Sequence, residues 1–367
     1  MPRLLLSAAL IVRNEERFLE ACLRSLEGCV DEIVVVDTGS TDRSLEIACG
    51  LGARVLHRAW TDDFSAARNA SVDAARGEWV LYIDADEEVV VFDRAKVESE
   101  LSDPRCACFT VRFRPLAGYT RYREHRLFRN RPDLRFRGII HESLLPALDV
   151  LCAREGLRVG ASSVALEHYG YADPRRKAER DLRLLRERLR AEPGHVYSWS
   201  HLGSTLAALG DAAGAEAAWR QGVEVVRRLR SRTLDDSLPH MRLARHLLDR
   251  KGDATALLEE GNRWFSDNHA LTWLLAQSRV GMHRYEQAMP LFARLAAIDP
   301  DRLDEGALAY DASIFGANAH AALGMCAFHL GRYADSAAHY ARAEFIAPDD
   351  PAIRAKRMFA AAKAGSV

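Results

Sequence analysis

The sequence predicts an α/β domain with a mostly parallel sheet, followed by an all-α domain of helical repeats. In the first half, short apolar runs that end in acids alternate with amphipathic segments. Right-handed crossovers fold such a pattern into a parallel sheet with helices on both faces. Beyond about Pro193 the strand signals stop, and short motifs recur at fixed spacings. We therefore expect domains at 1–192 and 193–367.

Composition narrows the class of protein. The chain has 367 residues, a formal net charge of −1 and 28% charged residues, which gives no sign of a general nucleic-acid binder. No apolar run reaches membrane-spanning length. The run from Leu4 to Val12 leads into Arg13-Asn-Glu-Glu and not into a cleavage site. The 7 cysteines follow no metal-ligand or disulfide spacing, so we expect a cytoplasmic protein.

The first strands and helices can be placed in order. We expect strands at 4–12, 32–37 and 53–56, and a fourth from Trp79 to Ile83. Between them, Asn14 and Ser65 are expected to cap helices. Further strands are expected at 106–113 and 124–128.

Acids stand at the ends of two of these strands. Asp37 ends the second strand, and Asp84 and Asp86 follow the fourth. Side chains alternate along a strand, so Asp84 and Asp86 should point to one side. Two carboxylates there repel each other unless a cation lies near them. Ligands of open α/β sheets bind at the carboxyl ends of strands, and Mg²⁺ commonly takes one or two carboxylates plus substrate phosphates. This placement predicts a metal–phosphate site.

Four motifs then resemble a known family. They are Ile11-Val-Arg-Asn-Glu15, Val35-Val-Asp-Thr-Gly-Ser-Thr-Asp42, Asp63-Phe-Ser-Ala-Ala-Arg-Asn69 and Tyr82-Ile-Asp-Ala-Asp-Glu87. In this order they resemble family 2 glycosyltransferases of the GT-A fold, over about the first half of the chain. The resemblance implies inverting transfer of a sugar, of hexosyltransferase type, from a nucleotide diphosphate-sugar with Mg²⁺ or Mn²⁺. Uracil is the base by analogy.

The resemblance also implies roles for single residues. Asp37 would bind the base or ribose, and Asn14 and Arg68 would lie at the nucleotide. Asp84 would reach the ribose or sugar, and Asp86 would hold the metal. Without the motif around it, Arg68 reads as a surface helix salt bridge.

The segment after these motifs should contain the catalytic base. An inverting displacement needs a group that takes the acceptor proton, and a carboxylate is the usual choice. Glu142 is the candidate and His141 the runner-up, the alternative being that both only brace a loop. This stretch resembles the bacterial subgroup with a short core and C-terminal repeats, which includes enzymes that glycosylate bacteriocin peptides on cysteine.

A histidine and a basic helix follow. Two aspartates leave a metal short of ligands, and His168 would supply one by analogy with other GT-A enzymes; the alternative is a packed histidine. Arg176, Lys177 or Arg180 could neutralise the leaving diphosphate. Residues beyond Arg180 read as a solvated face.

The second half resembles tetratricopeptide repeats. Gly331 to Pro348, His283 to Pro300 and Gly210 to Gly222 repeat one spacing, Asp236 to Phe265 reads as a degenerate copy, and an insertion around Asp301 to Ser313 breaks the period. Stacked repeats commonly hold a peptide or another subunit. The repeats therefore favour a peptide or protein acceptor, with a saccharide or a lipid-linked acceptor as the alternatives, and they offer a surface for a homodimer.

Two other functions compete with the enzyme hypothesis. One is a catalytically weak or inactive transferase-like scaffold that binds a protein partner through its repeats. The other is nucleotidyl transfer, which ranks low because no Gly-rich phosphate loop follows the first strand.

Overall fold

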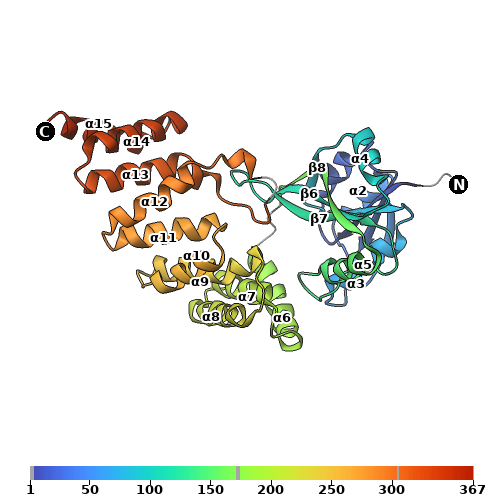
Figure 1. The fold of residues 1–367 in the computed structure, drawn as a ribbon. Helices are drawn as coiled ribbons and strands as arrows, with labels where there is room; N and C mark the ends of the chain where they lie inside the picture. The colour runs from blue at the N-terminus through green and yellow to red at the C-terminus, as the bar shows by residue number, and fades with distance from the viewer. Residues whose placement is uncertain (1–3, 171–173, 304–305, 367) are drawn as a thin grey trace. The chain divides into compact units, whose positions relative to one another are not determined.

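Two compact units make up the chain in a computed structural model that describes residues 4–170, 174–303 and 306–366. The division falls between Pro193 and Gly194, except that residues 118–120 group with the second unit and Gly306 with the first. The first unit is an α/β domain and the second consists of helices (Figure 1).

One mixed sheet of eight strands forms the centre of the first unit, among the described residues, in the order β3-β2-β1-β4-β7-β6-β8-β5. Strands β3, β2, β1 and β4 are parallel, and β7 then pairs antiparallel with both β4 and β6. Strand β8 is parallel to β6 and antiparallel to β5. The strands are β1 (Leu6–Val12), β2 (Glu32–Asp37), β3 (Arg54–His57), β4 (Trp79–Tyr82), β5 (Glu87–Val91), β6 (Cys106–Arg114), β7 (Tyr122–Arg129) and β8 (Arg158–His168).

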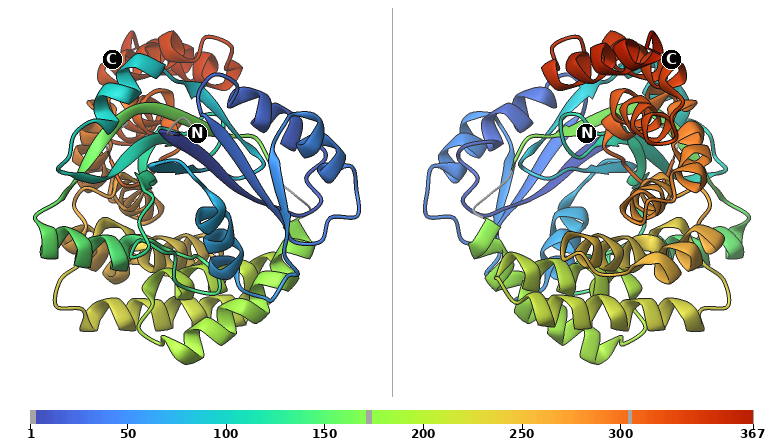
Figure 2. Two further views of the ribbon diagram at one scale, coloured as in Figure 1. Left: turned by 90° about the vertical axis from the view of Figure 1, so that its right-hand side faces the viewer. Right: turned by 90° about the vertical axis from the view of Figure 1, so that its left-hand side faces the viewer.

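Helices pack on both faces of this sheet. On one face, Leu19 and Leu23 of α1 and Val97 of α4 join a core that includes Trp79 and Leu81. On the other, Val72 of α3 and Leu148 of α5 join a separate core. Figure 2 shows helices on opposite sides of the strands. The helices are α1 (Leu19–Ser25), α2 (Ser44–Gly50), α3 (Phe64–Ala74), α4 (Arg94–Leu101), α5 (Leu145–Glu155) and α6 (Pro174–Ala191).

This architecture confirms the expected fold class, with differences of detail. The sequence reading did not expect β5 or β8 as strands. Both expected helix caps are wrong: α3 is capped by Asp63, whose carboxylate accepts from the Ala66 N–H, while Ser65 donates to Asp63. Asn14 lies before α1 with a left-handed backbone (φ 58°) and caps no helix.

Pairs of helices stack in sequence order in the second unit (Figure 1). Small residues let the partners approach: a Cβ on Gly203 of α7 would lie 2.3 Å from Trp219 Nε1 of α8, and one on Gly324 of α13 would lie 2.9 Å from the Tyr340 ring of α14. The helices are α7 (Val196–Ala208), α8 (Ala212–Arg228), α9 (Leu238–Asp249), α10 (Thr255–Trp264), α11 (His269–Gly281), α12 (Tyr285–Ala296), α13 (Ala317–His329), α14 (Tyr333–Ile346) and α15 (Pro351–Ala364).

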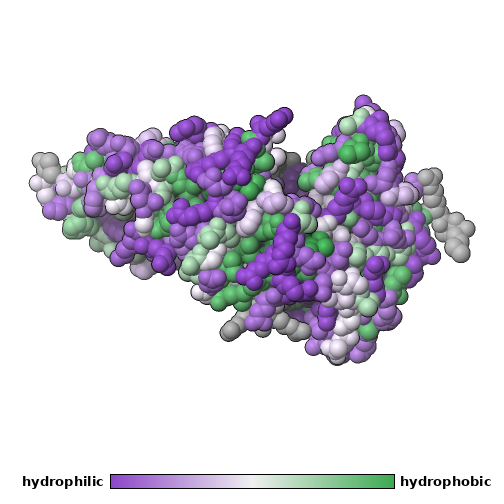
Figure 3. Space-filling view, turned by 90° about the horizontal axis from the view of Figure 1, so that it is seen from below, coloured by the Kyte–Doolittle hydropathy of each residue, from purple (hydrophilic) through white to green (hydrophobic). Residues whose placement is uncertain are grey.

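Short 3₁₀ helices occupy the expected insertion. They are Pro300–Arg302 and Ala312–Phe315, and a third, Leu234–Ser237, precedes α9. Over the described residues, the helices are all too short or too polar to span a bilayer. The face drawn in Figure 3 is largely hydrophilic, with hydrophobic residues in separate areas.

Candidate donor site at the strand ends

Asp37 closes β2 and organises the loop after it. Its carboxylate accepts the backbone N–H groups of Gly39 (3.1 Å) and Ser40 (3.0 Å), and His57 Nδ1 lies 3.5 Å from Oδ2. Burial opposes ionisation, but the hydrogen bonds from Ser40 and Gly39 outweigh it and lower the pKa of Asp37. Asp37 is thus a fixed anion at the edge where β1, β2 and β4 end.

Asn14 ties the loop after β1 to the loop after β2. Its Oδ1 accepts from the Thr41 N–H at 2.7 Å, and its own N–H donates to Ser40 Oγ at 3.0 Å. The left-handed backbone that excludes a helix cap is one that asparagine tolerates well. The structure therefore places Asn14 beside Asp37 as part of the same two-loop wall.

Arg68 joins two of the predicted site residues. This residue of α3 has a side chain only 6% exposed, and donates from Nη2 to Asp84 Oδ1 (2.8 Å) and from Nε to Glu142 Oε1 (2.7 Å). Burial opposes ionisation of Asp84, yet the charge of Arg68 prevails and lowers the pKa of Asp84 to about 2. The surface-salt-bridge reading of Arg68 is therefore wrong, because the residue is buried between two acids.

A second buried cation lies on the other side of Asp84, and the sequence reading missed it. Arg126 of β7 makes a two-point contact with Glu87 (3.0 and 2.9 Å), and its Nη1 lies 3.8 Å from Asp84 Oδ2. The Tyr82 ring contacts both arginines, with its centroid 4.8 Å from Arg68 Cζ and 4.4 Å from Arg126 Cζ. Burial raises the pKa of Glu87 to about 7, although Arg126 opposes the shift.

Asp86 and His168 meet beside this cluster. His168 Nε2 lies 3.0 Å from Asp86 Oδ2, at the end of β8 where His168 pairs with Glu87 of β5. Burial lowers the pKa of His168, but the hydrogen bond and charge of Asp86 prevail and raise it. The reading of His168 as a histidine packed under the sheet is not what the structure shows, since its ring nitrogen faces a site carboxylate.

This pair suits a cation that also binds substrate oxygens. Gly170 keeps Asp86 uncrowded, because a Cβ there would lie 2.5 Å from Asp86 Oδ2. The described part of the chain contains no group of three or more His, Cys, Asp or Glu side chains that could hold a metal. The protein therefore offers one carboxylate and one imidazole, a donor set that Mn²⁺ accepts and that phosphate oxygens would complete.

Glu15, in the first motif, is another acid that the sequence reading did not single out. Burial raises its pKa to about 7, and the negative charges of Asp86, Asp42 and Asp84 add to the shift. Its N–H donates to Ser44 Oγ at 2.8 Å. Glu15 therefore interacts electrostatically with Asp84 and Asp86, and a cation bound there would favour its ionised form. Its position three residues beyond the end of β1 was the available signal.

A loop from 137 to 143 carries His141 and Glu142. Arg137 and Ser143 close its base with reciprocal backbone hydrogen bonds of 3.1 and 3.0 Å. Asn69 holds the preceding residue, Phe136, through two hydrogen bonds to its backbone (2.8 and 3.0 Å). Asn69 and Arg68 both belong to the third motif. This motif therefore holds the loop in place through Asn69 and also supplies Arg68 to the site.

Arg188 of α6 supports this loop through hydrogen bonds to its backbone. Its guanidinium donates to the carbonyls of Ile140 and His141, the latter at 3.1 Å. Gly138 has φ +108°, and a Cβ there would lie 2.0 Å from Arg188 Nη1. His141 also has a left-handed backbone (φ 52°). The structure thus brings Glu142 to Arg68, whereas His141 contributes its carbonyl to Arg188.

Arg180 and Lys177 are the two site residues predicted on the basic helix, α6, whose side chains the structure describes. Arg180 packs over the Phe64 ring at 5.0 Å, and its charge opposes the rise in the pKa of Glu15. Lys177 is exposed on α6, and the structure does not join it to the site residues. The side chain of Arg176 lies outside the described residues.

The N-terminal part of the chain matches a family model. Residues 7–149 match the model of glycosyl transferase family 2, a segment that includes Asp37, Arg68, Asp84, Asp86 and Glu142. This confirms the resemblance that the four motifs predicted.

Individual relatives are similar over different parts of the chain. A TPR repeat-containing protein of Synechococcus elongatus is 41% identical over 226 residues, 59% of this chain and 56% of that protein. The SPbeta prophage-derived glycosyltransferase SunS of Bacillus subtilis is 30% identical over 143 residues, 37% of this chain and 34% of that protein. The matches therefore span between a third and just over half of these relatives.

Among solved structures, residues 1–349 of S. aureus TarS in complex with UDP-GlcNAc align with a TM-score of 0.40 and 16% identity. That alignment covers 76% of this chain and 92% of the TarS chain.

Proposed function

We propose that the N-terminal unit is an inverting, metal-dependent glycosyltransferase that moves a hexose from a UDP-sugar to an acceptor. The observation that carries the proposal is the Arg68 bridge, which holds Asp84 and Glu142 at 2.8 and 2.7 Å within the segment that matches the family. Asp86 and His168 lie next to this bridge. A charged cluster of this kind at strand ends is what binding and cleaving a nucleotide diphosphate requires.

The donor would lie across the strand ends. Asp37 is a fixed anion suited to the hydroxyl and imino donors of ribose and base, and Asn14 shapes the wall next to it. Asp84, held ionised by Arg68, would accept hydrogen bonds from ribose or sugar hydroxyls. Bound Mg²⁺ or Mn²⁺ would be held by Asp86, His168 and diphosphate oxygens, and would neutralise charge on the leaving diphosphate.

Glu142 is the proposed base. Its Oε1 accepts from Arg68 Nε, and Oε2 is the oxygen that would take the acceptor proton. The acceptor hydroxyl or thiol would attack the anomeric carbon, its proton would pass to Oε2, and the nucleoside diphosphate would depart from the opposite face. Arg180 and Lys177 on α6 would offset the negative charge of that leaving group.

The acceptor is proposed to be a peptide or protein presented by the helical repeats. The support is the repeat unit itself, since stacked helix pairs expose long binding surfaces, together with the similarity to SunS. Self-association through the repeats and a cytoplasmic location stay predictions.

The alternative is a scaffold without turnover, favoured by the size of the repeat unit. The two functions separate in one experiment: melting temperature with a panel of nucleoside diphosphates, with and without Mn²⁺, followed by release of free sugar from UDP-hexoses. A ligand that binds only the native state raises the melting temperature with its concentration. We expect a shift with UDP and Mn²⁺ that EDTA removes, and slow hydrolysis of the donor.

Two matched variants identify the site. Asp86→Asn should lose the Mn²⁺-dependent part of the shift, whereas Asp335→Asn, an exposed acid on α14, should keep it. Glu142→Gln should keep the UDP shift and lose sugar transfer, because Gln retains an oxygen for Arg68 but cannot take a proton. Binding of UDP without any hydrolysis or transfer would favour the scaffold.

A further inference from the structure

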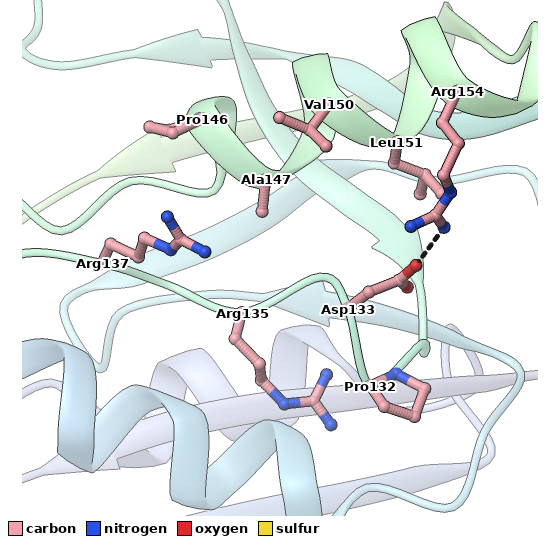
Figure 4. A pocket seen from close by; sticks show the side chains of 9 residues that line it. All are labelled: Pro132, Asp133, Arg135, Arg137, Pro146, Ala147, Val150, Leu151 and Arg154. Atoms are coloured by element: carbon pink, nitrogen blue, oxygen red, sulfur yellow. Dashed lines mark hydrogen bonds and ion pairs between the residues drawn. The ribbon is translucent and has the colours of Figure 1, made fainter.

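A pocket separate from the strand-end acids lies on the first unit. It has a volume of about 290 Å³ and lies between α5, from Pro146 to Arg154, and the loop 132–137 (Figure 4). This volume is at the lower end of the range for ligand pockets, and suits two or three residues of a peptide.

One wall of the pocket is apolar. It consists of Pro146, Ala147, Val150 and Leu151 on successive turns of α5. The Val150 side chain is 64% exposed, so a hydrophobic group that covered it would remove apolar surface from water. Figure 4 shows this wall facing the loop below it.

The opposite wall is basic, and Arg137 is the arginine on it whose charge is available to a ligand. Asp133 is already paired with Arg154 (2.6 Å) and Arg131 (3.0 Å), and Arg135 is paired with Asp73 (2.8 Å). Arg137 is exposed, and within the described parts of the chain its guanidinium has no hydrogen bond or ion pair. Three arginines and one paired acid line the pocket, so the pocket carries a net positive charge and should attract an anion.

We propose that this pocket binds a peptide segment with an aspartate or glutamate next to an aliphatic side chain. The carboxylate would accept the fork of N–H donors of Arg137, a geometry that guanidinium groups match in two-point contacts. The aliphatic side chain would cover Val150 and Leu151. The positive charge of the pocket favours an acidic side chain, and the apolar wall beside it favours an aliphatic side chain at the adjacent position of the peptide.

The pocket adjoins the loop that carries Glu142. Arg137 forms the base of that loop through its backbone pairing with Ser143. A segment on Arg137 would therefore be held next to the loop of the proposed base. That the segment belongs to the acceptor rests on the proposed function, whereas the binding itself does not.

Isothermal titration of the full chain tests the proposal. The probes are acetyl-Leu-Asp-Leu-amide and its neutral match acetyl-Leu-Asn-Leu-amide. We expect tighter binding of the aspartate peptide, and a loss of about tenfold with Arg137→Gln, the effect of one charge-assisted hydrogen bond. Val150→Ser should weaken both peptides. Neither variant should alter the melting-temperature shift with UDP and Mn²⁺, which reports the donor site independently.

Three results would overturn the proposal. They are no binding of the aspartate peptide to the wild-type chain, equal binding of the two peptides, and full affinity in Arg137→Gln. Octanoate that binds at this site more tightly than the peptide would assign it to small amphiphilic carboxylates instead. Failure of the UDP shift alone would count against the donor site and leave the peptide result intact.

Discussion

Replacing Arg68 by methionine isolates the contact on which the site depends. The side chain is 6% exposed and makes ion pairs with Asp84 and Glu142. Methionine fills a similar volume but cannot donate, so both carboxylates would lose their shared partner. Arg126, 3.8 Å from Asp84 Oδ2, would remain near Asp84.

The expected cost follows from burial. Removing one partner of a buried ion pair destabilises a protein by about 3–5 kcal/mol, because the remaining charge has no compensation. The Asp84 side chain is 37% exposed, so water relieves part of the penalty. We therefore expect about 3 kcal/mol. Arg68→Lys should recover only part of it, since an ammonium cannot reach two acids with a planar fork.

Hydrogen exchange read by mass spectrometry is the assay, because it reports the two units separately. A loss of about 3 kcal/mol corresponds to roughly 100-fold faster exchange of core amides that open only on global unfolding of the domain. The peptides to follow cover β1 and β4. Arg24→Met is the matched control, since Arg24 pairs with Glu20 on the surface with 58% and 57% of the side chains exposed, and it should change nothing measurable.

If the exchange rate of the core amides rises less than about threefold in Arg68→Met, the reasoning is refuted. A threefold change corresponds to about 0.6 kcal/mol, which is the scale of an exposed ion pair. Equal effects of Arg68→Met and Arg24→Met would do the same.

Three further predictions concern the loop, the sheet and the repeats. Gly138→Ala should reduce sugar transfer more than UDP binding, because its Cβ would displace Arg188 and the φ of +108° would be strained; single-turnover transfer and UDP melting shifts measure the two. Burial opposes ionisation of Glu32, but hydrogen bonds from Arg76, Ser7 and Arg54 outweigh it and lower the pKa of Glu32. The stabilisation from Glu32 is present above its pKa in the unfolded chain, near 4.5, and is lost as pH falls through its pKa in the folded chain. The first unit should therefore unfold at a lower urea concentration at about pH 4 than at about pH 6. Gly203→Ala should cost about 1–3 kcal/mol in urea unfolding, because its Cβ would overlap Trp219.

Each of these has an internal control. Transfer that is unchanged in Gly138→Ala would show that the loop does not position the base. Glu32→Gln should show a weaker pH dependence than the wild-type chain, and an identical dependence would exclude Glu32 as its source. Gly281→Ala, where an added Cβ meets nothing within 4 Å, should be neutral, so an equal cost at both glycines would argue against overpacking.

The order of the first elements, from β1 to β4, could be predicted from the sequence because it depends on local patterns. The run Glu32–Asp37 forms β2 as expected, and Asp37 stands at its end. Apolar periodicity and the placement of acids at strand ends are written along the chain. The repeats were visible for the same reason, since small residues such as Gly203 recur where helices must approach closely.

The helix caps show where local patterns fail. Asn14 and Ser65 are residue types that cap helices, yet Asp63 caps α3 and Asn14 bridges two loops. Several capping residues lie within a few positions of one another, and the choice among them depends on tertiary hydrogen bonds such as Thr41 to Asn14.

The identity of the site residues came from motifs, but their connections came only from the fold. Arg68 and Glu142 are 74 residues apart, and Arg126 and Glu87 are 39 apart, so no spacing relates them. Arg126 stood unremarked in an arginine-rich stretch because its burial, with only 5% of the residue exposed, depends on the strand pairing of β7 with β4. The sequence by itself determined which acids lie at the strand ends, and the tertiary structure decided which cations neutralise them, because that choice depends on contacts between segments far apart in the chain.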